Sequence, residues 1–315
     1  MSTATSRPRT TRHWGAVMSA MVTPFDTSGA LDLDAARDIA RWLQAHGNDG
    51  LVVAATTGEA STLTDDERCD LIRAVSEAVT IPVLAGTGSN DTAHTVGLTR
   101  QASELGAAGV LVVAPYYNRP PQAGIEAHFR AAAAATSLQV MIYDVPTRTG
   151  RRVAQDVLLR LFTEVPNIVA FKDATGDPPA AAALIAQAGG HFELYSGDDA
   201  FTLPLLAVGA VCVVGTTTHW TGPQTQAMIA AFNRGDVSGA RAINAQLQSS
   251  YRFVNSDACV YPMAIKAMLR SFGLPAGECR LPLPVAPPGT EDAARAVWRE
   301  LEEASVRFPP PLGEG

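Results

Sequence analysis

Short apolar segments alternate with helical patterns along most of the chain. Several are apolar throughout, rather than at every second position, which is typical of parallel strands that are covered on both faces. Eight segments have the length and composition of strands, and they begin at Ala16, Gly50, Pro82, Gly109, Gln139, Ile168, Phe192 and Val211. The pattern therefore predicts a parallel sheet whose strands are connected by helices.

The segments between these strands carry helix-start and helix-stop signals. Thr64 is followed three residues later by Glu67, which is the spacing of a capping box. Asp91 is a suitable N-cap, and Gly106 is a suitable stop for the helix that follows it. Eight strand–helix units predict a (β/α)8 barrel, a TIM barrel, over residues 15–235. A doubly wound open sheet is the alternative, but GTGSND lacks the third glycine of the dinucleotide-binding motif.

The residues outside the eight units form two tails and a helical extension. Residues 1–14 are polar and Arg-rich without the apolar run of a secretory signal, so we expect a disordered tail, with an organelle transit peptide as the alternative. Residues 309–315 form a second short tail. Helical patterns cover much of residues 236–308, too thin a region for a core of its own, so we expect these C-terminal helices to pack on the barrel. The predicted helices are 236–254, 260–272 and 291–308.

Composition and charge exclude several classes of protein. Of the 315 residues, 47% are hydrophobic and 17% are charged, so the chain can bury a large core. The net charge of −7 provides no basic surface for nucleic acid, and no apolar run has the roughly 18 residues of a membrane span. The four cysteines are far apart, which favours free thiols and a cytoplasmic location. No metal-binding or cofactor motif is visible, so we expect no cofactor.

Lysine is rare in this chain. Only Lys172 and Lys266 occur among the 24 basic residues. Arginine can replace lysine on a surface but cannot act as an amine nucleophile. Lys172 lies in the predicted sixth strand on the same face as two small alanines, so burial would lower the pKa of its amine. A structural ion pair with Asp173 or Glu59 is the alternative for Lys172, and a structural role is expected for Lys266.

The carboxyl ends of the predicted strands carry most of the polar side chains. Reactive residues of a barrel lie at this end. A threonine hydroxyl and two phenols could relay protons, an arginine could bind a carboxylate, and the Thr-Thr-Gly-Glu turn could hold another. Core tyrosines, a solvated arginine and ordinary turn chemistry are the alternatives. Asp198 and Asp199 are interpreted as helix caps rather than metal ligands. The candidate residues are Thr56, Thr57, Tyr117, Tyr143, Arg148, Lys172 and Gly197.

These residues lie in motifs that resemble one family over nearly the whole chain, from about Gly15 to Pro284. The motifs are AMVTPF, GLVVAATTGE, GTGSND, VVAPYYNRPP, YDVPTRTG, IVAFKDATG, YSGDDA and PMAIKAML. In order and spacing they are similar to the dihydrodipicolinate synthase / N-acetylneuraminate lyase family. The resemblance implies a (β/α)8 barrel with a C-terminal helical region and a Schiff-base lysine at Lys172.

Within the family, the chain is most similar to the dihydrodipicolinate synthase branch. The resemblance implies a proton relay of Tyr143, Thr57 and Tyr117, with Tyr117 reaching across a dimer interface. It implies that Arg148 binds the carboxylate of aspartate 4-semialdehyde. Thr56 and Thr57 match the branch's threonine pair, and Gly197 and Val214 fall where the branch lines its pyruvate pocket.

The resemblance also implies a reaction and an assembly. Lys172 would condense with pyruvate, and the resulting enamine would attack L-aspartate 4-semialdehyde to give 4-hydroxy-tetrahydrodipicolinate, a step toward diaminopimelate and lysine. A homotetramer built as a dimer of dimers is expected. The alternatives are sialate lyase, a 2-keto-3-deoxy sugar acid aldolase, a hydratase-aldolase, or a catalytically idle scaffold.

Regulation by lysine is a separate expectation. Lysine-inhibited members tend to have a serine, two histidines and a glutamate near the interface. This chain has Ala60, Asp65, Arg68 and His94 there, although Asn90 and Tyr116 match. We therefore expect feedback inhibition by lysine to be weak or absent.

Overall fold

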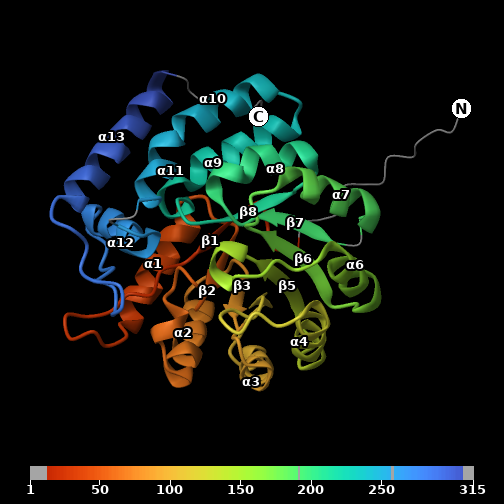
Figure 1. The fold of residues 1–315 in the computed structure, drawn as a ribbon. Helices are drawn as coiled ribbons and strands as arrows, with labels where there is room; N and C mark the ends of the chain where they lie inside the picture. The colour runs from red at the N-terminus through yellow and green to blue at the C-terminus, as the bar shows by residue number, and fades with distance from the viewer. Residues whose placement is uncertain (1–12, 191, 257–258, 308–315) are drawn as a thin grey trace, which may run out of the picture.

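A computed structural model describes residues 13–190, 192–256 and 259–307. Its centre is a closed barrel in which each strand pairs in parallel with the next and the last pairs with the first (Figure 1). The strands are β1 (Val17–Ala20), β2 (Gly50–Val53), β3 (Val83–Gly86), β4 (Gly109–Val113), β5 (Gln139–Asp144), β6 (Ile168–Asp173), β7 (Glu193–Ser196) and β8 (Cys212–Gly215). The predicted (β/α)8 barrel is confirmed.

Helices surround the barrel in the order of the chain (Figure 1). The fifth unit carries a short extra helix, α5, which the sequence pattern does not predict. The helices up to the last strand are α1 (Leu33–Ala45), α2 (Asp65–Ala78), α3 (Thr92–Ala102), α4 (Gln122–Ala134), α5 (Pro146–Thr149), α6 (Gln155–Glu164), α7 (Pro178–Ala188) and α8 (Thr202–Val208), and α9 (Thr218–Asn233) follows β8. Two single 3-10 turns, Ala60–Thr62 and Asp199–Phe201, follow β2 and β7.

Local sequence signals account for several helix ends. The Thr64 hydroxyl accepts from the Glu67 N–H and the Glu67 carboxylate accepts from the Thr64 N–H, so the predicted capping box is present. Asp91 caps α3 through the Ala93 N–H, as predicted. The α-helix ends at Ala102, and the chain reaches the predicted stop, Gly106, with a φ of +83°.

The strands divide the core into two layers because successive side chains point to opposite faces. Inward side chains such as Met18, Met141 and Ala170 fill the barrel interior. Outward side chains such as Ile142 and Phe171 pack against the helices. In β6 this alternation turns Lys172 inward and Asp173 outward, and the register places Lys172 between Tyr143 of β5 and Tyr195 of β7. The inner layer thus carries the reactive side chains at its carboxyl end.

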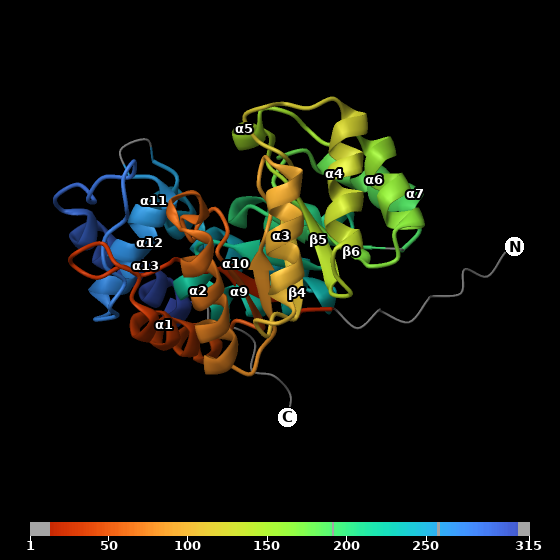
Figure 2. The ribbon, with the colours of Figure 1, turned by 90° about the horizontal axis from the view of Figure 1, so that it is seen from below.

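The C-terminal region packs on one side of the barrel, beside α1 and α9 (Figures 1 and 2). It differs from the prediction in one respect, because the helix expected over 236–254 is two helices. One ends at Gln246, the next begins at Gln248, and Leu247 between them is buried in the core. The helices are α10 (Val237–Gln246), α11 (Gln248–Val254), α12 (Tyr261–Ser271) and α13 (Thr290–Arg307).

The predicted tails lie outside the described residues, apart from His13 and Trp14. Trp14 is only 3% exposed, and its ring centroid lies 6.2 Å from that of Tyr195. The packed part of the chain therefore starts before residue 15, where the sequence boundary was placed. Across the described ranges, no helix is both long and apolar enough to cross a bilayer.

Candidate active site

Lys172 lies at the centre of the site. Its side chain rises from β6 into a cavity of about 180 Å³ at the carboxyl end of the barrel, and the residue is only 5% exposed. Its Nζ lies 4.2 Å from the centre of the Tyr143 ring. No carboxylate of the described residues lies within ion-pair distance of Nζ, so the alternative of a pair with Asp173 or Glu59 is wrong.

Burial determines the chemistry of this amine. Loss of water around the ammonium, reinforced by the positive charge of Arg148, lowers the pKa of Lys172 to about 8, while Asp199 and Asp198 oppose the shift. A substantial fraction of the amine is therefore neutral near physiological pH. A neutral amine in a cavity is a nucleophile for a carbonyl group.

Tyr143 occupies the position across from the lysine on β5. Burial raises the pKa of its phenol, so the phenol remains protonated and can donate a proton. A side-chain hydrogen bond with Thr56 partly offsets that rise in pKa. The family resemblance implies Thr57 for the relay hydroxyl, whereas the side chain that acts on the phenol in this structure is that of Thr56. The two adjacent threonines look equivalent in sequence, and the turn after β2 decides between them.

Thr57 has a different place in the site. It is 3% exposed and lines the Lys172 cavity together with Thr56. Among the described residues, the N–H groups of Thr56, Thr57 and Gly58 have no hydrogen-bond acceptor, and those of Thr56 and Thr57 belong to the cavity lining. The amides of Glu59 and Ala60, by contrast, bond back to the carbonyls of Thr56 and Ala55. The turn thus leaves two donors free beside the amine. Such a pair can hold the carboxylate of a small 2-oxo acid.

Arg148 stands at the mouth of the cavity in the last turn of α5. Its guanidinium carbon lies 4.7 Å from the ring centre of Tyr261. Nothing in the described ranges forms an ion pair or a side-chain hydrogen bond with Arg148. Its N–H donors are therefore available to a bound anion, as the sequence analysis expects.

Gly197 and Val214 differ in their relation to the cavity. Gly197 lines it, and an added Cβ would come within 3.0 Å of both the Ala174 Cβ and the Asp173 carbonyl oxygen. The close approach of two loops therefore favours glycine, because a side chain here would have to displace its neighbours by a few tenths of an ångström. Val214 is fully buried in the inner core and does not line the cavity. It is part of the packed barrel interior, which fills the space between the strands.

Asp198 and Asp199 brace the loops around the lysine. Asp198 accepts from the Ala200 N–H, as predicted for a helix cap. Asp199 accepts from the N–H and hydroxyl groups of both Thr216 and Thr217, which joins the loops after β7 and β8. The expectation of a cap is confirmed for Asp198, whereas Asp199 acts as a brace between loops.

Sequence reasoning missed the contribution of the C-terminal region. Tyr261 and Asn255 line the Lys172 cavity, although they follow the last barrel strand by some forty residues or more. Neither is part of a strand-end motif, so their place could not be inferred from the barrel pattern. The only indication in the sequence is that Tyr261, an aromatic residue, directly precedes Pro262 at the start of α12.

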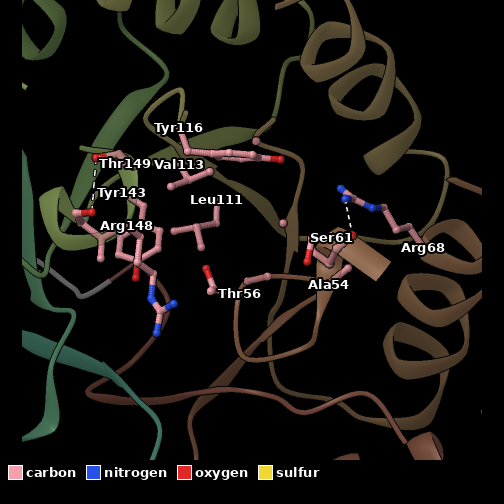
Figure 3. A pocket seen from close by; sticks show the side chains of 15 residues that line it. Ala54, Thr56, Ser61, Arg68, Leu111, Val113, Tyr116, Tyr143, Arg148 and Thr149 are labelled. Carbon is pink, nitrogen blue, oxygen red and sulfur yellow. Dashed lines mark hydrogen bonds between the residues drawn. The ribbon is translucent and has the colours of Figure 1, made fainter. Parts of the chain in front are cut away.

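A second cavity, of about 230 Å³, adjoins the first (Figure 3). Tyr116 and Arg68 line only the second cavity. The two cavities share the lining residues Ala55, Thr56, Tyr143, Val145 and Arg148. Arg68 is 6% exposed, donates from Nη2 to the Ala60 carbonyl, and has no partner for its Nε and Nη1 in the described structure. This cavity therefore contains a buried cation without an anionic partner.

Tyr117 is separated from the other candidates. Its side chain is 89% exposed, and it lines neither cavity. Its φ of +71° is rare for a residue with a side chain and points to a local constraint on this loop. The single chain thus brings together every predicted candidate of the Lys172 cavity except Tyr117 and Val214.

Lys266 has the structural role expected for it. It is fully buried on α12, and its ammonium donates to the Glu59 carboxylate at 2.6 Å and to the Glu278 carbonyl at 2.9 Å. Glu59 also accepts from the Arg280 N–H. The glutamate of the Thr-Thr-Gly-Glu turn therefore anchors the C-terminal region to the barrel and does not enter the lysine site.

The fold and the site together define a class: barrel enzymes that act through the amine of a buried lysine. Comparisons with known proteins specify the family. The model of the dihydrodipicolinate synthetase family matches residues 13–303. The chain belongs to this family.

Named relatives are similar over most of their lengths. The 4-hydroxy-tetrahydrodipicolinate synthase of Moorella thermoacetica is 46% identical, with 91% of this chain and 98% of the relative covered. That of Acidothermus cellulolyticus is 49% identical, with 93% and 92% covered. A crystal structure of dihydrodipicolinate synthase from Bacillus anthracis matches with a TM-score of 0.87 at 39% identity, covering 91% of this chain and 98% of that one. A structure of the enzyme from Cyanidioschyzon merolae with lysine bound matches with a TM-score of 0.89 at 38% identity, covering 93% and 99%.

Proposed function

We propose that this protein condenses pyruvate with L-aspartate 4-semialdehyde through a Schiff base on Lys172, giving 4-hydroxy-tetrahydrodipicolinate. It is a lyase of lysine and diaminopimelate biosynthesis, the activity for which its relatives are named. The observation that carries the mechanism is the buried Lys172 amine, which has no ion-pair partner in the described structure and a pKa lowered to about 8.

The first step is imine formation. The neutral Lys172 amine attacks the ketone carbon of pyruvate, while the free N–H groups of Thr56 and Thr57 hold the pyruvate carboxylate. The Tyr143 phenol, which lies beside Thr56 in the cavity lining, gives a proton to the departing hydroxyl, so that water leaves and an iminium remains. A proton transfer of this kind typically contributes about 10²–10⁴ in rate.

The second step forms the carbon–carbon bond. The iminium withdraws electrons from the methyl group, which loses a proton to give an enamine. The enamine carbon attacks the aldehyde carbon of aspartate semialdehyde, and the new alkoxide takes up a proton. Arg148 binds the carboxylate of this second substrate, because its N–H donors lie at the mouth of the cavity without another partner in the described residues.

The third step releases the product. The amino group that came with aspartate semialdehyde attacks the iminium carbon, the bond from that carbon to Lys172 breaks, and the ring closes. Lys172 is returned as an amine. The second substrate must therefore carry an aldehyde, an amine and a carboxylate, and a sugar-acid aldehyde lacks the amine that closes this ring.

An assembly of copies completes the site in this proposal. Tyr117 supports it, because a large aromatic side chain that is 89% exposed in one chain is well placed to contact another. We assign Tyr117 to the proton relay of a neighbouring subunit in a homotetramer built as a dimer of dimers. No disulfide joins Cys69, Cys212, Cys259 or Cys279 in the described structure, which supports a reducing compartment, for which we propose the cytoplasm.

The test is turnover of pyruvate and aspartate semialdehyde, followed by coupling to a dihydrodipicolinate reductase. We expect activity in the wild type and none above background in Lys172→Ala. If the wild type is inactive while borohydride still traps pyruvate on Lys172, the imine is right and the aldehyde is wrong, and sugar-acid aldolases become the better assignment. If pyruvate is not trapped, the mechanism is wrong.

A further inference from the structure

Tyr261 joins the C-terminal helices to the substrate end of the barrel. It is the first residue of α12, and it lines the Lys172 cavity together with Arg148. The Arg148 guanidinium carbon lies 4.7 Å from the centre of its ring, within the range of a cation–π contact. Two segments that are distant in sequence thus meet at the mouth of the cavity.

The way in which Arg148 is held matters for its chemistry. A carboxylate partner within the protein would occupy the N–H donors that a substrate needs. An aromatic ring contacts the flat face of the guanidinium and leaves the donors at its edge free. Arg148 is exposed and lies in a helix of only four residues, so its backbone alone does not fix its long side chain. The ring of Tyr261 supplies that restriction without consuming a donor.

Tyr261 is itself on a rigid support. Every residue of α12 from Pro262 to Leu269 is buried. One and a half turns beyond Tyr261, Lys266 ties the helix to Glu59 in the turn after β2. On the preceding side, Val260 pairs with Asn255 in an antiparallel bridge. The ring therefore has a fixed position relative to the barrel.

We propose that Tyr261 is a positioning residue for the second substrate: its ring holds the Arg148 guanidinium in the orientation that receives the carboxylate of the aldehyde. Helix α12 is then part of the specificity for an aldehyde that carries a carboxylate. This inference rests on the proposed function of Arg148. Among the described residues, no hydrogen bond joins the Tyr261 side chain to Lys172 or Tyr143, so its effect falls on the binding of the second substrate through Arg148.

Two substitutions test the role of the ring. Tyr261→Leu removes the ring but keeps apolar volume, and we expect it to raise the KM for aspartate semialdehyde by roughly 3- to 30-fold, the range of a cation–π contact. The kcat and the KM for pyruvate should change less than the KM for the aldehyde. Tyr261→Phe keeps the ring and should retain most of the affinity. Equal losses in both variants would assign the effect to the hydroxyl and overturn the proposal.

A double-mutant cycle tests whether Tyr261 acts through Arg148. In an Arg148→Ala background, Tyr261→Leu should produce no further rise in the KM for the aldehyde. Additive effects would mean that Tyr261 acts on its own, and a loss of kcat with unchanged KM values would mean that it acts on the chemistry. Either result overturns the proposal. Thermal melting of each variant separates these outcomes from loss of the fold.

A binding measurement keeps this test independent of turnover. Pyruvate is reduced onto Lys172 with borohydride, the reagent is removed, and succinate semialdehyde is titrated calorimetrically into the adduct. We expect weaker binding in Tyr261→Leu than in Tyr261→Phe, and no difference between them for butanal, which has no carboxylate. If no adduct forms, the proposed imine on Lys172 is wrong. Titration of succinate semialdehyde into the untreated enzyme then still tests whether Tyr261 contributes to its binding. Equal binding of succinate semialdehyde by the two variants would overturn it.

Discussion

The two lysines of this chain, Lys172 and Lys266, are both buried and have opposite surroundings. Lys266 donates to the Glu59 carboxylate and the Glu278 carbonyl, and it also lies 4.4 Å from the Phe25 ring centre. Lys172 has the Tyr143 ring at 4.2 Å but no carboxylate within ion-pair distance in the described structure. Both are thus next to an aromatic ring, and the acceptor groups make the difference.

This comparison shows how the same side chain becomes structural or reactive. An ammonium that is removed from water is costly unless hydrogen-bonded anionic groups replace the water. Lys266 has such groups, and its contact with Glu59 connects α12 to the barrel. Lys172 lacks them, and burial shifts its equilibrium toward the neutral amine. The absence of an ion-pair partner in the described structure is thus what favours a neutral, nucleophilic amine at Lys172.

The sharpest test of the contrast is covalent. Treatment with pyruvate and borohydride should label Lys172 and leave Lys266 unlabelled, because Lys266 is fully buried and its ammonium is held by two acceptors. Peptide mass spectrometry can assign the adduct directly, since the chain has no other lysine side chain. Lys172→Arg should abolish labelling, because a guanidinium does not form the imine. An adduct on Lys266 would contradict the contrast, because it would show that the paired lysine also reacts with pyruvate.

The second test removes the paired cation. Lys266→Met leaves the Glu59 carboxylate buried without its partner, and we expect a loss of about 3–5 kcal/mol in the free energy of unfolding. Urea denaturation would measure it. The double variant Lys266→Met/Glu59→Gln removes the unpaired charge and should recover part of this loss. No recovery would indicate that packing, rather than charge, accounts for the effect.

Replacing Lys172 by methionine should change the free energy of unfolding in the opposite direction to Lys266→Met. Lys172 has a pKa lowered from 10.5 to about 8, so the folded protein binds fewer protons than the unfolded chain between these values. The lowered pKa of Lys172 therefore destabilises the folded state. The destabilisation has its full size below pH 8 and disappears as the pH rises toward 10.5. Lys172→Met should therefore raise the unfolding free energy by roughly 1–3 kcal/mol at pH 7. The gain should shrink as the pH approaches 10, and a loss of stability at pH 7 would contradict the argument.

The smallest expected effect concerns free L-lysine as a ligand. The cavity beside Tyr116 already holds the Arg68 guanidinium, and two of its nitrogens have no partner among the described residues. A second cation would need an anionic partner there, and Asp65, one of the positions that depart from the lysine-inhibited pattern, is already bound to His94 at 2.8 Å. We expect millimolar lysine to change the initial rate by less than twofold in the coupled assay, with the reductase alone as control. A steep decline at sub-millimolar lysine would refute this.

Much of the site could be predicted from the sequence because its parts are local. The alternation of strands and helices predicts the barrel, and the position of Lys172 in an apolar strand predicts a buried amine. Tyr143 lies at the carboxyl end of β5 and Arg148 in the short helix that follows it, so the barrel pattern predicts both to lie at the reactive end. The choice between Thr56 and Thr57 could not be predicted, because both lie in one turn and only its backbone path decides which hydroxyl meets the phenol.

What the sequence determined by itself is therefore the order of elements and the residue types at the reactive end of the barrel, since both depend on periodicity and on neighbours along the chain. Only the tertiary structure decided the partners. It placed Glu59 with Lys266 instead of Lys172, and it brought Tyr261 from the C-terminal helices onto Arg148. The physical reason is that a pKa shift, an ion pair or a cation–π contact depends on the distance between groups in space. That distance is set by the packing of helices on the barrel, which brings together residues that are far apart in sequence.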